Sequence, residues 1–142
     1  MKYFLSVLFL TTILQAAMNR NPSLEVVVDT QNRLMWMDNK ENILKQMSHK
    51  EAEPYCENLR YGGYTNWRLP TLEEFETIVD KQNFKTYIHK AFKYNVPTGY
   101  WAIKAHFRTL WFYADYMNFV SGTAYFDNRN VNKYVRCVRT IK

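Results

Sequence analysis

The sequence predicts a single α+β domain, and three observations lead to that prediction. Two stretches each combine a helix-capping box with an apolar stripe at helical spacing. The last third alternates short aromatic runs with turn residues, which is typical of strands. The 142 residues, of which 47% are hydrophobic and 17% aromatic, suffice for one core and exclude a disordered chain.

The N-terminus has the layout of a signal peptide. Lys2 precedes a mostly apolar run over residues 3–14, and small residues suitable for cleavage follow at 15–17. The run is too short for a comfortable membrane span, although an uncleaved anchor remains open. We therefore expect residues 1–17 to be a signal peptide, residues 18–142 to form one domain, and the protein to be exported to the periplasm, cell surface or medium.

The first half of the domain should contain a hairpin and a helix. Residues 24–28 and 34–37 are apolar runs separated by turn-forming residues, which predicts a β-hairpin. Ser48 and Glu51 form the first capping box, and the stripe after it places Cys56 toward the core. Pro54 either kinks this helix or marks where its regular part begins, and Gly62-Gly63 should end it.

A short corner leads to the second helix. Residues 67–69 should be extended, because the residue before Pro70 avoids helical backbone angles. Thr71 and Glu74 form the second capping box, and the helix after it should end near Asp80.

The remaining residues are expected to form mainly strands. We predict a short helix near residues 87–92 and strands over 100–103, 110–120, 123–126 and 134–139. In the last strand Val and Cys alternate with Arg, so the arginines should face solvent.

Charge and cysteine content narrow the function without fixing it. The net charge of +6 favours acidic partners such as nucleic acid, anionic polysaccharide or a membrane surface, unless it only forms a solvated basic surface. Two cysteines are too few for a disulfide scaffold or a four-ligand zinc site. They would form one bridge in an oxidising compartment and buried thiols in the cytosol.

Two motifs are specific enough to indicate a family. The run Gly-Gly-Tyr-Thr-Asn-Trp-Arg-Leu-Pro-Thr at 62–71 and the run Tyr-Val-Arg-Cys-Val-Arg at 134–139, in order with Leu34-Met35-Trp36 and Tyr100-Trp101, resemble the Lcl C-terminal domain family. This is a bacterial domain of unknown function named after a collagen-like adhesin. The resemblance extends from about Glu25 to Arg139.

The resemblance implies a fold and a cysteine pairing. The family looks related to C-type-lectin-like and formylglycine-generating-enzyme-like folds, which implies two helices packed on a small, twisted, mostly antiparallel sheet with long loops and neighbouring chain ends. Lectin-like folds commonly bridge a cysteine of the first helix to one of the final strand, and Cys56 and Cys137 occupy those positions. One departure is that Ala102-Ile103-Lys104 stands where family members often have Ser-Ser-Thr, so roles of those hydroxyls do not carry over.

The sequence contains no motif for catalysis or metal binding. The three histidines are scattered, and the Asp127 loop does not match a calcium-binding pattern. Trp67 and Arg68 suit a structural corner, with binding of an anion or a sugar face as the alternative. Candidate ligand-binding residues are the cations and the indole that lie among aromatic residues: Arg68, Lys104, Arg108, Trp111, Arg129 and Lys133.

We therefore expect an exported, non-enzymatic binding module for recognition at the cell surface or in the periplasm, with acidic glycans as candidate ligands. The alternatives are a structural or accessory subunit of an envelope or pilus assembly, and an enzyme of the formylglycine-generating type. The expected partners are an acidic polysaccharide or an envelope protein, with no nucleic acid, cofactor or metal. The loops after Lys81 and around Asp127 are where we would look first for a ligand.

Overall fold

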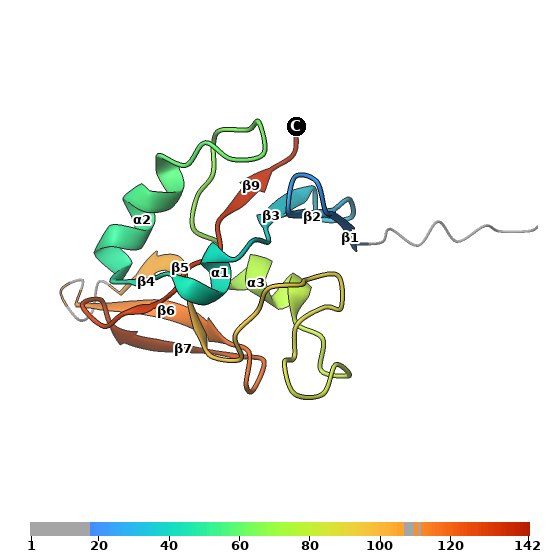
Figure 1. The fold of residues 1–142 in the computed structure, drawn as a ribbon. Helices are drawn as coiled ribbons and strands as arrows, with labels where there is room; N and C mark the ends of the chain where they lie inside the picture. Colours follow the sequence, from blue (N-terminus) through green and yellow to red (C-terminus); the bar gives the residue numbers. More distant parts are fainter. Residues whose placement is uncertain (1–17, 107–109, 111) are drawn as a thin grey trace, which may run out of the picture.

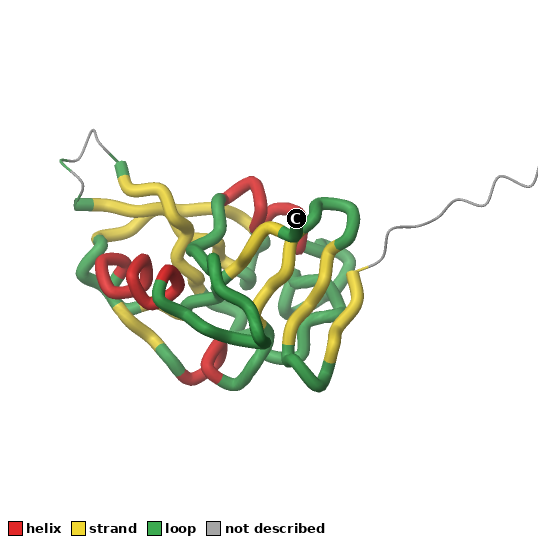
Figure 2. Tube along the Cα trace, turned by 90° about the horizontal axis from the view of Figure 1, so that it is seen from above, coloured by secondary structure: helices red, strands yellow, loops and turns green. Residues whose placement is uncertain are grey.

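The structure is a computed structural model that describes residues 18–106, 110 and 112–142. The expected signal peptide at 1–17 and the candidate residues Arg108 and Trp111 lie outside the described residues. The described chain is α+β, with short strands and helices joined by long loops, as predicted (Figure 2).

Two small sheets form the domain, where a single sheet was expected. The first sheet is antiparallel and has the order β1 (Met18–Asn21), β2 (Val26–Asp29), β3 (Leu34–Met37) and β9 (Val138–Thr140). The second has the order β4 (Gln46–Met47), β8 (Lys133–Tyr134), β5 (Gly99–Ala105), β6 (Tyr113–Asn118) and β7 (Thr123–Asn128), and only its β5–β8 pair is parallel. Figure 1 shows the two sheets on opposite sides of the molecule.

Three helices are present in the described chain: α1 (Glu41–Leu44), α2 (His49–Glu57) and α3 (Leu72–Ile78). Both predicted capping boxes are confirmed, with the side chains of Ser48 and Thr71 at the two N-caps. Helix α2 ends at Glu57, well before the glycines expected to end it, and Pro54 lies inside it. The single turn of α1 was not predicted.

The hairpin of β2 and β3 is confirmed, and β3 is buried on both faces. Trp36 packs with Phe75 of α3 in one core cluster, while Met35 and Met37 pack with Cys56 of α2 in a second cluster. Because a cluster covers each face, β3 shows no alternation of polar and apolar residues.

The two ends of the described domain belong to one sheet. Met18 pairs with Asp29, Asp29 pairs with Leu34, and Leu34 pairs with Thr140. These residues form one row across four neighbouring strands, so the ends are separated by three strand spacings, or roughly 14 Å. The neighbouring ends implied by the family resemblance are therefore present.

The prediction for residues 134–139 is wrong in one important respect. The segment is divided between β8 of the second sheet and β9 of the first, so no continuous strand exists to set an alternation. Val135, Arg136, Cys137 and Val138 are all buried, and the Arg136 side chain has no exposed surface. Arg136 therefore points into the protein, where it pairs with the equally buried Asp38.

The expected helix at 87–92 is also absent. Ile88 forms an isolated β-bridge with Val79, and the amide of His89 donates to the Ile78 carbonyl. Lys85 and Tyr87 both have positive φ angles, which a right-handed helix does not allow. The segment is held by the end of α3 and stays irregular.

Cys56 and Cys137 form a disulfide, as the family resemblance implied. Cys56 lies on α2, and Cys137 lies between β8 and β9. The bridge therefore connects a helix to the segment that passes from one sheet to the other.

Candidate binding site

The corner at Gly62–Thr71 begins with a tight turn. Tyr61 and Tyr64 exchange backbone hydrogen bonds of 3.0 and 2.9 Å, and Gly62 and Gly63 lie between them with φ angles of +61° and +80°. Two successive positive φ angles define a turn that glycine adopts without strain. The turn presents Tyr64, a residue that is 38% exposed, at the surface.

The chain after the turn is fixed to the final strand. The backbone N–H and C=O of Arg68 both bond to Val138 of β9, at 2.9 Å each. Trp67 is buried, and its indole N–H donates to the Tyr64 carbonyl at 3.1 Å. The corner is therefore built mainly from its own backbone and from β9, consistent with the structural interpretation of Trp67.

Arg68 is engaged by the second helix. Its two terminal nitrogens donate to the two carboxylate oxygens of Glu74 at 2.6 and 2.8 Å, and one also reaches the Thr140 hydroxyl at 3.2 Å. Burial raises the pKa of Glu74, but the hydrogen bonds from Arg68 and from the Thr71 amide outweigh burial and leave this pKa below its usual range. The charge of Arg68 is therefore largely compensated within the protein.

A cleft of about 670 Å³ opens between this corner and the end of the chain. Its lining is Met35, Tyr64, Asn66, Arg68, Arg139, Thr140, Ile141 and Lys142. The Arg139 guanidinium carbon lies 4.3 Å from the centre of the Tyr64 ring, and its Nε donates to the Thr65 carbonyl at 3.2 Å. The cleft thus combines an exposed aromatic ring with cations.

Arg139 and Lys142 are the cations of the cleft whose side chains have no Asp or Glu partner in the described part of the chain. Within residues 18–106, 110 and 112–142, no carboxylate lies within 4.0 Å of either side chain, whereas Arg68 pairs with Glu74. The terminal nitrogens of Arg139 have no hydrogen-bond acceptor among those residues either. An anionic group in the cleft would therefore find the Arg139 guanidinium already positioned by Tyr64 and Thr65.

The remaining candidate cations do not share this cleft. Arg129 donates from Nε to Nδ1 of the buried His49 at 3.0 Å and lies 3.8 Å from Glu53. Burial lowers the pKa of His49, so its neutral ring can accept from Arg129 at Nδ1 while Nε2 contacts the Ala102 carbonyl at 2.9 Å. Arg129 is therefore part of a buried network.

Lys133 is enclosed by side chains of the second sheet. Its Nζ donates to Asp127 at 2.8 Å and lies 4.0 Å from the centre of the Tyr116 ring. A Cβ atom at Gly99 would stand 2.7 Å from that ring, so only glycine leaves room for this packing. Lys104, by contrast, is exposed on β5 beside a separate pocket of about 310 Å³.

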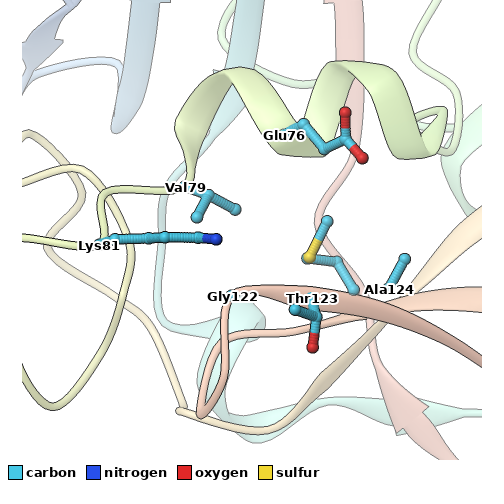
Figure 3. Close-up of a pocket in the computed structure, with 7 residues that line it drawn as sticks. Glu76, Val79, Lys81, Gly122, Thr123 and Ala124 are labelled. Carbon is cyan, nitrogen blue, oxygen red and sulfur yellow. The ribbon is translucent and has the colours of Figure 1, made fainter.

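The loops around Asp127 and after Lys81 were named as the first places to look for a ligand, and around Asp127 the polar groups are already bonded within the protein. The two carboxylate oxygens of Asp127 accept from Lys133 and from the Asn128 amide, and the Asn128 side chain accepts from the Asn130 amide. The first residue of the other loop, Lys81, reaches a pocket of about 400 Å³ between α3 and the β6–β7 turn, opposite Glu76 (Figure 3). The negative charge of Glu76 and the positive charge of Lys81 therefore line the same pocket.

Sequence reasoning did not select Tyr64, Arg139 or Lys142 as ligand-binding residues. Tyr64 and Arg139 lie in the two most specific motifs, but 75 positions separate them. The site could have been found only by knowing that these two motifs are neighbours in the folded protein. Among the ligand-binding residues expected from the sequence, Arg68 is the only one within the described residues that lines the cleft.

No helix in the described ranges is long and apolar enough to cross a membrane. Searches of curated proteins and of solved structures find no match to this chain. A family model, by contrast, matches residues 25–139, which include both sides of the cleft up to Arg139. The chain therefore belongs to the Lcl C-terminal domain family.

Proposed function

We propose that this protein is an exported, non-enzymatic binding module that recognises acidic glycans in the cleft between the Gly62–Thr71 corner and β9. The observation that carries the proposal is the Arg139 guanidinium stacked on the exposed Tyr64 ring, with its terminal nitrogens unpartnered among the described residues. A planar guanidinium matches the geometry of a carboxylate or sulfate group.

The other features of the cleft suit a sugar polymer. An exposed tyrosine offers both an apolar face and a hydroxyl, a combination that accommodates the mixed surface of a sugar ring. Lys142 adds a second cation that can follow a repeating anion along a polymer.

The finer fold assignment, a C-type-lectin-like domain, is part of the proposal. It is supported by the disulfide from α2 to the C-terminal segment and by the chain ends in one sheet. Export is supported by the signal-peptide layout of residues 1–17 and by a disulfide, which persists in oxidising compartments. Fold alone does not establish function, so the cleft carries the argument.

Binding to heparin, as a sulfated probe, tests the proposal against dextran, a neutral control. We expect heparin binding at about 50 mM salt that weakens at least tenfold by about 500 mM, because salt screens charge pairs. Arg139→Gln should weaken binding about tenfold, since a charged hydrogen bond contributes roughly 1.5 kcal/mol or more. Isothermal titration calorimetry measures both effects.

A matched pair of lysine variants separates a site from a generally basic surface. Lys142→Gln alters the cleft, whereas Lys90→Gln removes the same charge from an exposed position outside it. We expect only the first to weaken heparin binding. Equal weakening by both variants, or no binding at low salt, would overturn the proposal.

The alternative of a formylglycine-generating-type enzyme needs a free, reactive thiol. Both cysteines of the chain are joined in the disulfide, which does not favour that alternative. Titration of thiols in the natively purified protein tests it directly, because a reactive free thiol would support the enzyme over the binding module.

A further inference from the structure

Strand β7 forms an open edge of the second sheet. It pairs with β6 on one side and is the last strand in the sheet order, and Figure 1 shows it at the outer margin of the molecule. Residues 123–126 are all exposed, with Tyr125 at 48% and Phe126 at 63%. Among the strands of the described residues, the edge is therefore unpaired, and it is largely apolar.

The hydrogen-bond register shows which backbone groups of β7 point outward. The Arg129 amide donates to the Phe112 carbonyl, which continues the β6–β7 ladder by one pair. Because bonded and non-bonded pairs alternate in an antiparallel ladder, residues 123, 125 and 127 bond to β6. Ala124 and Phe126 therefore direct their N–H and C=O groups away from the sheet.

The outward backbone groups of Ala124 and Phe126 differ from those of Asn128, the next residue of β7 that points outward, in whether they have a hydrogen-bond partner. The Asn128 amide donates to its neighbouring Asp127 side chain, and the Asn128 carbonyl accepts from the Val131 amide. Within the described ranges, the backbone groups of Ala124 and Phe126 have no such partner. The open edge is thus a short template centred on Tyr125.

Natural edge strands are usually protected against pairing by lysine, proline or a bulge. β7 contains none of these, and its register with β6 is uninterrupted. Its single charged residue is Asp127, which is already paired with Lys133. Nothing in the strand itself therefore opposes the addition of another strand.

We propose that β7 pairs antiparallel with β7 of a second copy of this chain, about a two-fold axis at Tyr125. In this register Ala124 of each copy opposes Phe126 of the other, so the outward N–H and C=O groups bond to each other. The two Tyr125 side chains become a directly opposed, non-hydrogen-bonded pair. The result is a sheet that continues through both copies.

The side chains favour a second copy as the occupant. On one face, the exposed Phe126 ring lies beside the small Ala124 of the other copy, and Tyr113 holds the ring at a centroid distance of 5.9 Å. On the other face, Tyr125 already stacks on Tyr116 at 5.8 Å, so the opposed pair extends an existing aromatic row. Asp127 opposes Thr123 of the other copy, which avoids facing carboxylates.

Sedimentation velocity over a range of concentrations tests the proposal on the protein purified from an oxidising compartment. We expect the monomer mass at low micromolar concentration and a rise to the dimer mass at hundreds of micromolar. Phe126→Lys should raise the dissociation constant at least tenfold. Phe84→Lys, a matched change at a loop position that is 78% exposed, should leave it unchanged.

Cysteine cross-linking tests the register. Tyr125→Cys should form an interchain disulfide on mild oxidation, because directly opposed positions bring their Cβ atoms close together. Thr123→Cys should not, because its counterpart in the other copy is Asp127. The proposal would be overturned by a protein that stays monomeric at hundreds of micromolar, or by one that cross-links equally through both positions. A monomer whose β7 edge binds a different protein would overturn it as well.

Discussion

At the residue scale, Asp38 and Arg136 form a charged pair with no exposed side-chain surface. The Asp38 carboxylate accepts from Arg20 at 2.6 Å and from the amides of Lys93 and Tyr94 at 3.0 Å each. Arg136 also donates to the carbonyls of Met37 and Tyr94. One buried carboxylate thus joins the first sheet, the loop before β5 and the segment between β8 and β9.

We predict that Asp38→Asn lowers the free energy of unfolding by about 3–5 kcal/mol, because it leaves Arg136 as an uncompensated buried charge. The new amide group would also face backbone donors. Urea denaturation measures the loss. Glu25→Gln is the matched control, since it removes an exposed carboxylate 3.7 Å from Arg20 and should cost less than about 1 kcal/mol. Equal losses in both variants would contradict this account.

The same pair shows why the sequence misled at this position. A pattern of Val, Cys and Val against Arg is the usual sign of a half-buried strand. Arg136 departs from this pattern because its hydrogen-bond acceptors are distant in sequence. The Met37 carbonyl and the Asp38 carboxylate lie 99 and 98 positions earlier, and the Tyr94 carbonyl lies 42 positions earlier. No local pattern reports such partners.

At the scale of elements, the sequence predicted where the helices begin but did not predict which strands pair. Each capping box needs only four consecutive residues, and both helices begin where those residues predict. The assignment of β9 to the first sheet depends on pairing with β3, about a hundred positions earlier. Contacts between residues far apart in sequence leave no local pattern. For this reason the sequence indicated Arg68 at the corner but did not predict that Tyr64 and Arg139 are in contact.

Glu74 combines a helix cap with the Arg68 ion pair, and its role depends on pH. A carboxylate with a lowered pKa stabilises the fold above the pKa it has when unfolded, and this contribution is lost as pH falls through the folded-state pKa. We predict that Glu74→Gln loses about 1 kcal/mol at pH 7, since glutamine keeps the cap but not the charge.

Urea denaturation at pH 7 and at pH 3 measures this difference. The gap between wild type and Glu74→Gln should shrink toward pH 3, because the carboxyl with the lowered pKa takes up its proton in the unfolded chain before it does so in the folded protein. Glu73→Gln changes an exposed neighbour on the same helix and should leave stability nearly constant at both values. A gap that stays constant with pH would show that the charge of Glu74 does not stabilise the corner.

At the scale of the whole molecule, two small sheets share a core that neither could enclose alone. α3 fills the space between them through Phe75 and Ile78, and the segment at 135–138 passes from one sheet to the other. The Cys137 carbonyl accepts from the Met37 amide of β3 at 3.0 Å, and its sulfur is bonded to α2. The disulfide therefore connects α2 to the place where the two sheets meet.

This position predicts a large contribution of the disulfide to stability. The bridge joins residues 81 positions apart, and loop entropy in the unfolded chain then gives about 4 kcal/mol. We expect the double variant Cys56→Ala/Cys137→Ala to lose that amount in urea denaturation. Each single variant, measured with a reducing agent that prevents its remaining thiol from forming an interchain bridge, should lose nearly as much, because either change breaks the same bond. Losses that add up from the single variants to the double would show that the two side chains stabilise the core by packing separately, and that the bridge itself contributes little.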